Sequence, residues 1–555
     1  MQLIKLPRQR AGRPRSKFGC RTCRARHVKC DETPGTCLNC TSTGRKCDGY
    51  DVRLPPASRN SREARTTCMQ LEIKTGFRWT MTSDERRCFS YFQHQTIPNL
   101  LGFFDSPLWR NLVFQIGQDE PAVYHAMVAL SAIHQDSEAK GMALSWDHQH
   151  NAWHQFALEQ LGRAYTFLTK RRSSHDPRLR NVTLMCCLLF VMADLLQGRY
   201  DDAFVHLQSG VRILKELEAH RQLVAPTMSE ELVEQCLVSA FAHLDIMSAH
   251  YGVGGPLLCI DDEWDNSKYN SEYMIVFSNL AEAARAFDPV HSAVFRWLVP
   301  CMGASRKYIE ENFQALVDRQ LNIWPRLRLF MRSFTSFYDS TYKTLSLTEQ
   351  RGADIIYLQM LVAALSLRTT LLKRRPMALQ CFTPQYKEIL RRSEDIICKY
   401  PKPPTIVMEA GIIPPLYHAA ADCQDINVRW QAIQILWSWP HREGPFDSNW
   451  IASLCSLGLK KKMLSIIEKG FGAEVTVTCR SGESISPMEV IKLIDQWHAR
   501  QYLGKSSKSD RRTEGVDCSP LVLMKSVKSM QNWSCVRAFL EYTSDAENLM
   551  PAAEY

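Results

Sequence analysis

Apolar side chains recur at helical spacing through most of the chain beyond residue 80. Residues 203–217, 355–372 and 487–502 each place apolar side chains three and four positions apart, which is the pattern of a helix with one buried face. Ser83–Glu85 offers a hydroxyl and two carboxylates where the first such run begins, a typical helix start. The pattern therefore predicts a series of amphipathic helices.

Two further runs are apolar on more than one face, as expected of helices buried on all sides. One runs from Pro121 to Ile133, and the other covers 184–196 with Asp194 as its only charge. We expect the second run to be a buried helix, too short and too interrupted to span a bilayer. Strand-like alternation is rare, and 473–479 is the only short candidate. An all-α domain of stacked helices is the predicted fold of this region.

Changes in pattern divide the chain into six predicted parts. These are a basic arm at 1–19, a cysteine-rich domain at 20–47, a linker at 48–79, a helical domain at 80–503, a second linker at 504–518 and a tail at 519–555. The first linker contains two adjacent prolines and no apolar heptads, so a coiled-coil dimer is not supported. The tail mixes apolar and acidic residues, which fits an activating segment or a final docked helix.

Positive charge is concentrated at the N-terminus of this 555-residue chain, whose net charge is +10. Residues 1–67 hold 16 lysines and arginines against 5 acidic residues, whereas the remainder holds 52 basic and 53 acidic residues. A basic module joined to a neutral body is typical of nucleic-acid binding. The arm predicts a nuclear import signal or a phosphate contact, with a solvated tail as the alternative. It holds six cations, of which Arg8, Arg10, Arg13, Arg15 and Lys17 are the candidate contacts and Lys5 is the sixth.

Six cysteines follow the arm with the spacing C-x2-C-x6-C-x6-C-x2-C-x6-C; they are Cys20, Cys23, Cys30, Cys37, Cys40 and Cys47. Zinc takes four ligands, so six thiolates can hold two ions if two sulfurs bridge both. The first cysteine of each half, Cys20 and Cys37, is the natural bridging ligand. A disulfide knot and a single zinc site with two spare cysteines are the alternatives. No secretory segment precedes the cluster, and the duplicated spacing favours two zinc ions.

Basic residues fill the intervals between the cysteines. The intervals carry Arg21, Arg24, Arg26, His27, Lys29, Arg45 and Lys46. Six thiolates on two zinc ions carry a net negative charge, which offsets some of these cations. The remaining positive charge suits contact with phosphates and with the major groove of DNA. The alternative is that the cations serve only to neutralise and solubilise the cluster.

This segment resembles the DNA-binding domain of fungal binuclear zinc cluster transcription factors. The resemblance rests on the six spacings, on the basic run 24–29 before Cys30-Asp31, and on Pro34 in the following loop. It implies that the first helix enters the major groove and reads a CGG-type triplet. The implied base contacts are Arg26 and His27, with backbone support from Arg24 and Lys29. Arg45 and Lys46, in the last interval between the cysteines, are further candidates for DNA contact because of their charge. Many members have lysine where this chain has His27, which leaves the triplet preference open.

The helical region also resembles a known family, the fungal-specific transcription factor regulatory domain. The matching segments are 103–109, 120–133, 430–433 and 440–448, with His441 and Phe446 in place of an arginine and a tryptophan. The resemblance implies a nuclear transcription regulator acting on RNA polymerase II promoters. Its implied partners are double-stranded DNA and the transcription machinery or co-regulators, with no membrane. The oligomeric state stays open, a homodimer without a coiled coil included.

Sequence motifs of enzymes are missing. No HExxH, Walker-type, GxSxG or dinucleotide-binding glycine pattern occurs. His148, His150 and His154, and the acidic residues 261–265, are better explained as solvated side chains than as metal sites. The alternative function is a zinc-dependent enzyme or metal-responsive protein in which the cluster is only structural. All-thiolate sites leave no open position for a substrate, so we expect no enzyme.

Overall fold

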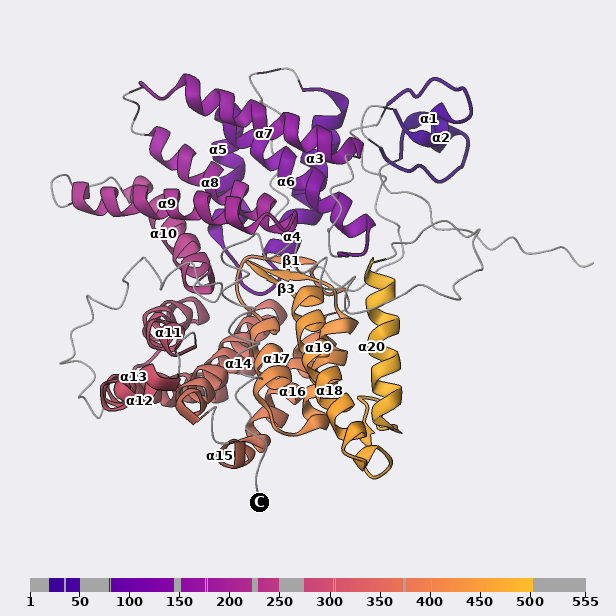
Figure 1. The fold of residues 1–555 in the computed structure, drawn as a ribbon. Coiled ribbons are helices and arrows are strands. Elements are labelled where there is room, and N and C mark those ends of the chain that lie inside the picture. The colour runs from indigo at the N-terminus through magenta and orange to yellow at the C-terminus, as the bar shows by residue number, and fades with distance from the viewer. Residues whose placement is uncertain are drawn as a thin grey trace, which may run out of the picture. The chain divides into compact units, whose positions relative to one another are not determined.

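A computed structural model describes residues 19–33, 36–49, 79, 81–143, 151–174, 176, 178–221, 228–248, 274–302, 304, 306–372, 376–400 and 402–502 (Figure 1). The basic arm, Pro34, most of the first linker, the acidic residues 261–265 and the C-terminal tail lie outside these residues. The predictions made for those segments therefore stay predictions.

The elements up to residue 221 are α1 (Arg21–Ala25), α2 (Leu38–Thr41), α3 (Ser83–Tyr91), the π-helix η1 (Phe92–Thr96), α4 (Ile97–Leu100), the π-helix η2 (Leu108–Leu112), α5 (Val113–Asp119), α6 (Pro121–Ala139), α7 (Ala152–Lys170), α8 (Arg178–Leu196) and α9 (Tyr200–Arg221). Those that follow are α10 (Met228–Ser248), α11 (Leu280–Met302), α12 (Arg306–Glu311), α13 (Phe313–Thr341), the 3-10 helix η5 (Tyr342–Thr344), α14 (Leu347–Thr369), the 3-10 helix η6 (Thr370–Leu372), α15 (Pro376–Gln380), α16 (Thr383–Cys398), β1 (Ile406–Val407), α17 (Ile413–Asp422), α18 (Ile426–Ser438), β2 (Arg442–Glu443), β3 (Phe446–Asp447), α19 (Ser448–Glu468), the 3-10 helix η7 (Phe471–Ala473), β4 (Val477–Thr478), β5 (Ser484–Ile485) and α20 (Pro487–Tyr502). A small cysteine cluster followed by a large helical domain is the predicted fold class, and it is confirmed.

The chain divides into two compact units. The first comprises residues 1–96, 115–136 and 149–173, and the second comprises 97–114, 137–148 and 174–555. Among the helices of the first unit, α3 starts with a capping box in which Thr82 and Glu85 bond each other's backbone N–H groups. Glu85 is buried and also accepts a hydrogen bond from Arg163 of α7 at 2.6 Å. One carboxylate thus caps one helix and ties a second to it.

The second unit contains an aromatic core shared by α11, α13 and α14. Phe287 stacks on Phe330 at 4.9 Å between ring centroids, and Phe330 stacks on Phe334 at 5.6 Å. All three side chains are at least nine-tenths buried and belong to one cluster of buried apolar residues. Large aromatic side chains at helical spacing therefore supply much of the stabilising burial here.

Helices α16, α17, α18, α19 and α20 of the second unit lie side by side at the C-terminal end of the described chain (Figure 1). A three-stranded sheet of order β1-β2-β3 and a hairpin of β4 and β5 accompany them. The β2–β3 turn contains Gly444 with φ of 51°, a left-handed conformation that glycine adopts without strain. The predicted strand at 473–479 is confirmed only at β4. Treating it as the only candidate was wrong, because two-residue strands are too short to show alternation.

Two helices have the length and composition of membrane spans, α8 and the helical stretch Leu347–Leu372. The expectation that the run at 184–196 is too short was wrong, because α8 continues it to 19 residues. The apolar windows of the two helices are 78% and 72% buried inside the protein. The expected burial of 184–196 is therefore confirmed.

Candidate metal centre and nucleic-acid interface

The two halves of the cysteine cluster (residues 19–49) repeat one local geometry. Cys20 precedes α1 in an extended conformation, and its sulfur accepts a hydrogen bond from the Cys23 N–H at 3.3 Å. Cys37 precedes α2 in the same way, and its sulfur accepts from the Cys40 N–H, also at 3.3 Å. Each sulfur thus takes the position of an N-cap oxygen, where the helix N-terminus favours negative charge. The duplicated spacing in the sequence is a duplicated structure.

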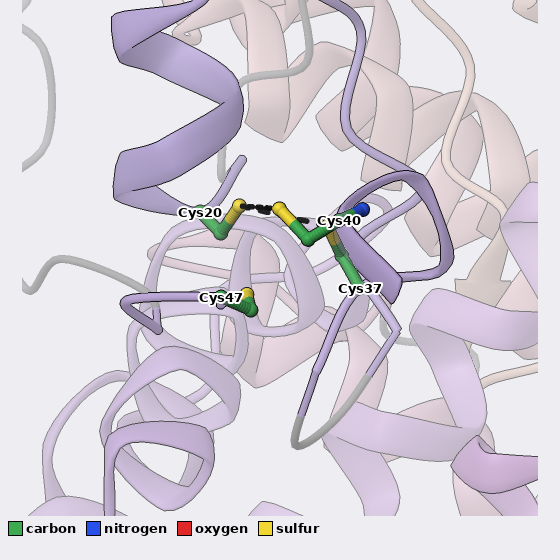
Figure 2. A group of neighbouring side chains, drawn as sticks. All are labelled: Cys20, Cys37, Cys40 and Cys47. Carbon is green, nitrogen blue, oxygen red and sulfur yellow. Dashed lines mark hydrogen bonds between the residues drawn. The ribbon is translucent and has the colours of Figure 1, made fainter. Parts of the chain in front are cut away.

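The six sulfur atoms lie together at the centre of this cluster. Cys20 Sγ is 3.6 Å from Cys37 Sγ and 3.8 Å from Cys40 Sγ, and Figure 2 shows the second pair side by side. Two sets of four cysteines have all their sulfurs within 4.8 Å of one another; the sets are Cys20, Cys37, Cys40 and Cys47, and Cys20, Cys23, Cys30 and Cys37. The sets share Cys20 and Cys37, the two residues that the sequence singled out as bridging ligands.

These distances fit two zinc ions. A zinc–sulfur distance of about 2.3 Å gives a tetrahedron with edges of about 3.8 Å, which matches the sulfur separations. Burial raises the pKa of the Cys20 and Cys37 thiols above the ordinary value, so thiolates there need a cation beside them. The Cys30 sulfur accepts hydrogen bonds from the backbone N–H groups of Cys20 and Glu32, each at 3.4 Å. The donor set is thus complete, soft and anionic, as structural zinc requires.

Polar side chains that the sequence analysis did not single out fasten the loops of the cluster. Asp31 accepts hydrogen bonds from the backbone N–H groups of Leu38 at 2.9 Å and Asn39 at 3.0 Å, at the start of α2. Although burial opposes its ionisation, these bonds and one from Thr33 hold the pKa of Asp31 below its usual value. Thr22 and Asp48 exchange hydrogen bonds of 2.9 and 3.0 Å and so join the end of the cluster to α1.

The predicted DNA-contacting side chains lie on the surface of the cluster. His27, Lys29, Arg45 and Lys46 are exposed, and Arg24 and Arg26 are half-buried. Arg26 donates a hydrogen bond to the Thr43 hydroxyl at 3.3 Å, which links the end of α1 to the turn after α2. The predicted arm contacts, from Arg8 to Lys17, lie outside the described residues.

His27 occupies a special backbone position. Its φ is 55°, the left-handed region, and its N–H donates to the Arg24 carbonyl at 3.1 Å just after α1 ends. Glycine and asparagine are the residues that most readily terminate a helix in this conformation. The left-handed backbone at the end of α1 therefore restricts which residues suit this position, independently of any contact that the imidazole makes.

The segment 440–448 of the helical domain surrounds a fully buried carboxylate. Glu443 accepts hydrogen bonds from the backbone N–H groups of Gly411, Ile412 and Ile413 at 2.8 to 3.0 Å, at the start of α17. The His441 Nε2 atom lies 2.9 Å from the same carboxylate. The sequence marked this segment as a family signature without revealing that Glu443 ties β2 to α17.

The residues weighed as an enzymatic metal site are not brought together in the part of the chain that the structure describes. His154 lies in α7, whereas His148 and His150 fall outside the described residues. Among the described residues, the groups of His, Cys, Asp and Glu close enough to share a metal ion consist of cysteines alone. The cluster is therefore the metal centre that the geometry supports.

Comparison with known proteins identifies both parts of the chain. The family model of the fungal Zn(2)-Cys(6) binuclear cluster domain matches residues 18–57, and that of the fungal-specific transcription factor domain matches residues 87–469, more than half of the chain. No solved structure matches the chain.

Three curated relatives are transcription regulators. The chain is 30% identical over 262 residues to the aspercryptin biosynthesis cluster-specific transcription regulator of Emericella nidulans. The matched region covers 44% of this chain and 41% of that protein. It is 26% identical over 208 residues to a transcription regulator of Purpureocillium lilacinum, covering 36% of this chain and 49% of the relative.

Over 44 residues the chain is 54% identical to a transcriptional regulatory protein of Schizosaccharomyces pombe, covering 8% of this chain and 9% of the relative. The chain thus spans less than half the length of these curated relatives. The metal centre and both family matches agree: the chain belongs to the fungal-specific transcription factor family, and its N-terminal domain is a binuclear cluster in which six cysteines hold two zinc ions.

Proposed function

We propose that the protein is a nuclear regulator that docks its zinc cluster in the major groove of RNA polymerase II promoters and reads a CGG-type triplet. The observation that carries this proposal is the surface of the cluster, where basic side chains surround a core of buried sulfurs. An exposed cationic surface on a compact metal-held knob suits contact with phosphates and base edges. Recruitment of co-regulators by the helical domain belongs to the same proposal.

Each basic residue has a role in this proposal. Arg26 and His27 contact bases, while Arg24, Lys29, Arg45 and Lys46 contact phosphates and fix the register on the duplex. All six cysteines are zinc ligands, and the Cys20 and Cys37 thiolates bridge the two ions. The arm from Arg8 to Lys17 adds phosphate contacts and directs nuclear import.

Selection from a random duplex pool by the full-length, zinc-loaded protein tests the proposal. We expect enrichment of a CGG-type triplet. Neutralisation of about six phosphates predicts that log affinity falls against log salt with a slope of about −5. A selection that enriches no sequence, with an affinity that does not change with salt, would show that the cluster is only structural.

Two variants separate base contacts from backbone contacts. His27→Asn preserves the left-handed backbone because asparagine tolerates it, but removes the imidazole. We expect the variant to change the preferred base at one position of the selected motif. Arg13→Ala is the control and should weaken binding to all sequences alike. An identical motif from the His27→Asn variant would remove His27 from the base-reading residues.

A further inference from the structure

A small pocket lies inside the second unit, among α10, α11, α14 and the segment that follows β1. It offers about 50 Å³ to the centres of water-sized molecules. A single water needs roughly 10–15 Å³ on this measure, so the pocket can hold several waters or one small organic group. Four of its lining residues carry titratable side chains: His243, Asp288, His291 and Glu409.

For three of these groups the structure indicates either a bonding partner or a protonation state. The His243 Nδ1 atom donates a hydrogen bond to the Ser239 carbonyl at 2.9 Å, and its Nε2 atom lies 3.4 Å from Asp288 Oδ1. Burial opposes a charge on His243, but the carboxylates of Asp288 and Glu409 raise its pKa above the usual value. Burial, together with the nearby His243, lowers the pKa of His291 to about 3, so His291 is neutral. Asp288 and His243 therefore form a pair, which leaves one further carboxyl group.

That remaining group is Glu409. Glu409 is only 6% exposed. Within the described residues its Oε2 atom has no hydrogen-bond partner. A buried carboxylate oxygen without a partner is costly to the fold. Glu443 lies on β2, the strand that pairs with β1, and is fully buried, but its carboxylate accepts three backbone N–H groups. The contrast leaves the Oε2 atom of Glu409 as a buried acceptor without a donor among the described residues.

The rest of the pocket is apolar and aromatic. Phe104, Phe287, Ile246, Met247, Ile355 and Ile356 form its walls. The Phe287 ring also stacks on the His291 imidazole at 4.9 Å between centroids. Aromatic faces and a carboxylate together favour an organic cation. A metal ion is disfavoured, because among the described residues the groups with metal-compatible spacing are the cysteines of the cluster.

We propose that this pocket binds a small protonated amine, whose ammonium group bonds Glu409 and whose alkyl portion lies against Phe104 and Phe287. The ligand contacts α10, α11 and α14 at once, so its binding stabilises their arrangement. This inference rests on the proposed function, because it makes the amine an effector of a transcription regulator. The effector would need a positively charged group for Glu409 and a short apolar portion for the aromatic walls.

Calorimetric titration of the full-length, zinc-loaded protein with butylamine, butan-1-ol and butyrate tests the inference. The three probes have similar size, but only the amine is a cation at neutral pH. We expect saturable binding of butylamine, at least tenfold tighter than that of butan-1-ol, and no binding of butyrate. Absence of saturable binding by the amine would mean that the pocket holds only water and would overturn the proposal. Equal binding of amine and alcohol would also overturn it.

Three variants locate the site. Glu409→Gln preserves the side-chain volume and should lower butylamine affinity at least tenfold, whereas Glu483→Gln changes an exposed carboxylate and should leave it within twofold. Ala284→Met adds bulk to the lining and should also block binding, which tests the site without touching a charge. Unchanged affinity in both pocket variants contradicts the assignment.

Sequence-specific DNA binding is measured in parallel on the same samples. If butylamine binds through Glu409 but the zinc-loaded protein selects no DNA sequence, the proposed function fails and the amine site stands. If DNA selection succeeds in wild type and in Glu409→Gln but the amine does not bind, the amine site fails and the proposed function stands.

Discussion

Among the described residues, the buried apolar core of the cysteine cluster consists of cysteines, whereas that of the helical domain consists of aliphatic and aromatic side chains. The two largest aliphatic side chains near the cysteines point to solvent, since Val28 is 41% exposed and Leu38 is 62% exposed. Apolar burial therefore contributes little to the fold of the cluster, and metal–thiolate bonds must supply its stability. The two regions should respond in opposite ways to metal removal and to substitutions in the apolar interior.

Metal removal should produce the largest difference between the two regions. Structural zinc supplies roughly 10–16 kcal/mol in small zinc domains, so a chelator should unfold residues 19–49. The helical domain should keep its structure, because its core contains no metal-compatible group among the described residues. Hydrogen exchange followed by mass spectrometry measures both regions at once. Continued protection of α1 and α2 without zinc would contradict this interpretation.

A substitution of the buried Glu443 should have the reverse effect. Glu443→Gln places an NH2 group among three backbone N–H donors and should destabilise the helical domain by about 3–5 kcal/mol. Zinc content should stay at two ions per chain. Denaturant unfolding and metal analysis are the measurements. Loss of zinc together with loss of helical stability would show that the two regions do not fold independently.

Glu409 should make the helical domain less stable as the pH rises. Burial raises its pKa to about 7 from an ordinary 4.5, with His243 opposing that rise and Asp288 reinforcing it. The folded state thus holds a proton that the unfolded chain releases, and stability falls between about pH 4.5 and 7.

Wild type should lose about 1–3 kcal/mol across that range relative to Glu409→Gln, which cannot ionise at this position. Burial lowers the pKa of His243, and the carboxylates of Asp288 and Glu409 raise it, so the difference between the two proteins reports the ionisation of Glu409 together with its coupling to His243. Parallel unfolding curves at each pH provide the measurement. Identical pH profiles of the two proteins would mean that Glu409 is not buried as described.

The smallest effect should come from one exposed cation of the cluster. Lys29→Ala should weaken DNA binding roughly three- to tenfold and reduce the magnitude of the salt slope by about one. Lys307→Ala is the matched control, since Lys307 is exposed on α12 of the helical domain and should not affect DNA affinity. Fluorescence anisotropy at several salt concentrations distinguishes the two. Equal losses in both variants would place DNA binding outside the cluster.

The sequence predicted features that depend on residue spacing, and it missed features that depend on tertiary contact. Two predicted helix starts, Pro121 and Pro487, are the observed first residues of α6 and α20, because proline suits a first turn. Cysteine spacing likewise predicted the shared positions of Cys20 and Cys37 in the two sulfur sets.

The roles of Glu409 and Glu443 could not be predicted, because nothing local distinguishes a bonded carboxylate from an unbonded one. The donors that bond Glu443 come from residues 411–413, about 30 positions earlier in the chain. The capping role of Asp31 depends on α2 in the same way, since its partners are seven and eight residues later. Local patterns do not determine such pairings.

Zinc titration with simultaneous measurement of DNA binding tests most directly that the metal-held cluster is the DNA-binding surface. Full-length protein stripped of metal is titrated with zinc while the anisotropy of a labelled duplex bearing the selected site is recorded. We predict that affinity is lost without zinc and is fully restored at two zinc ions per chain. Sequence-specific binding of the same strength by the metal-free protein would contradict it.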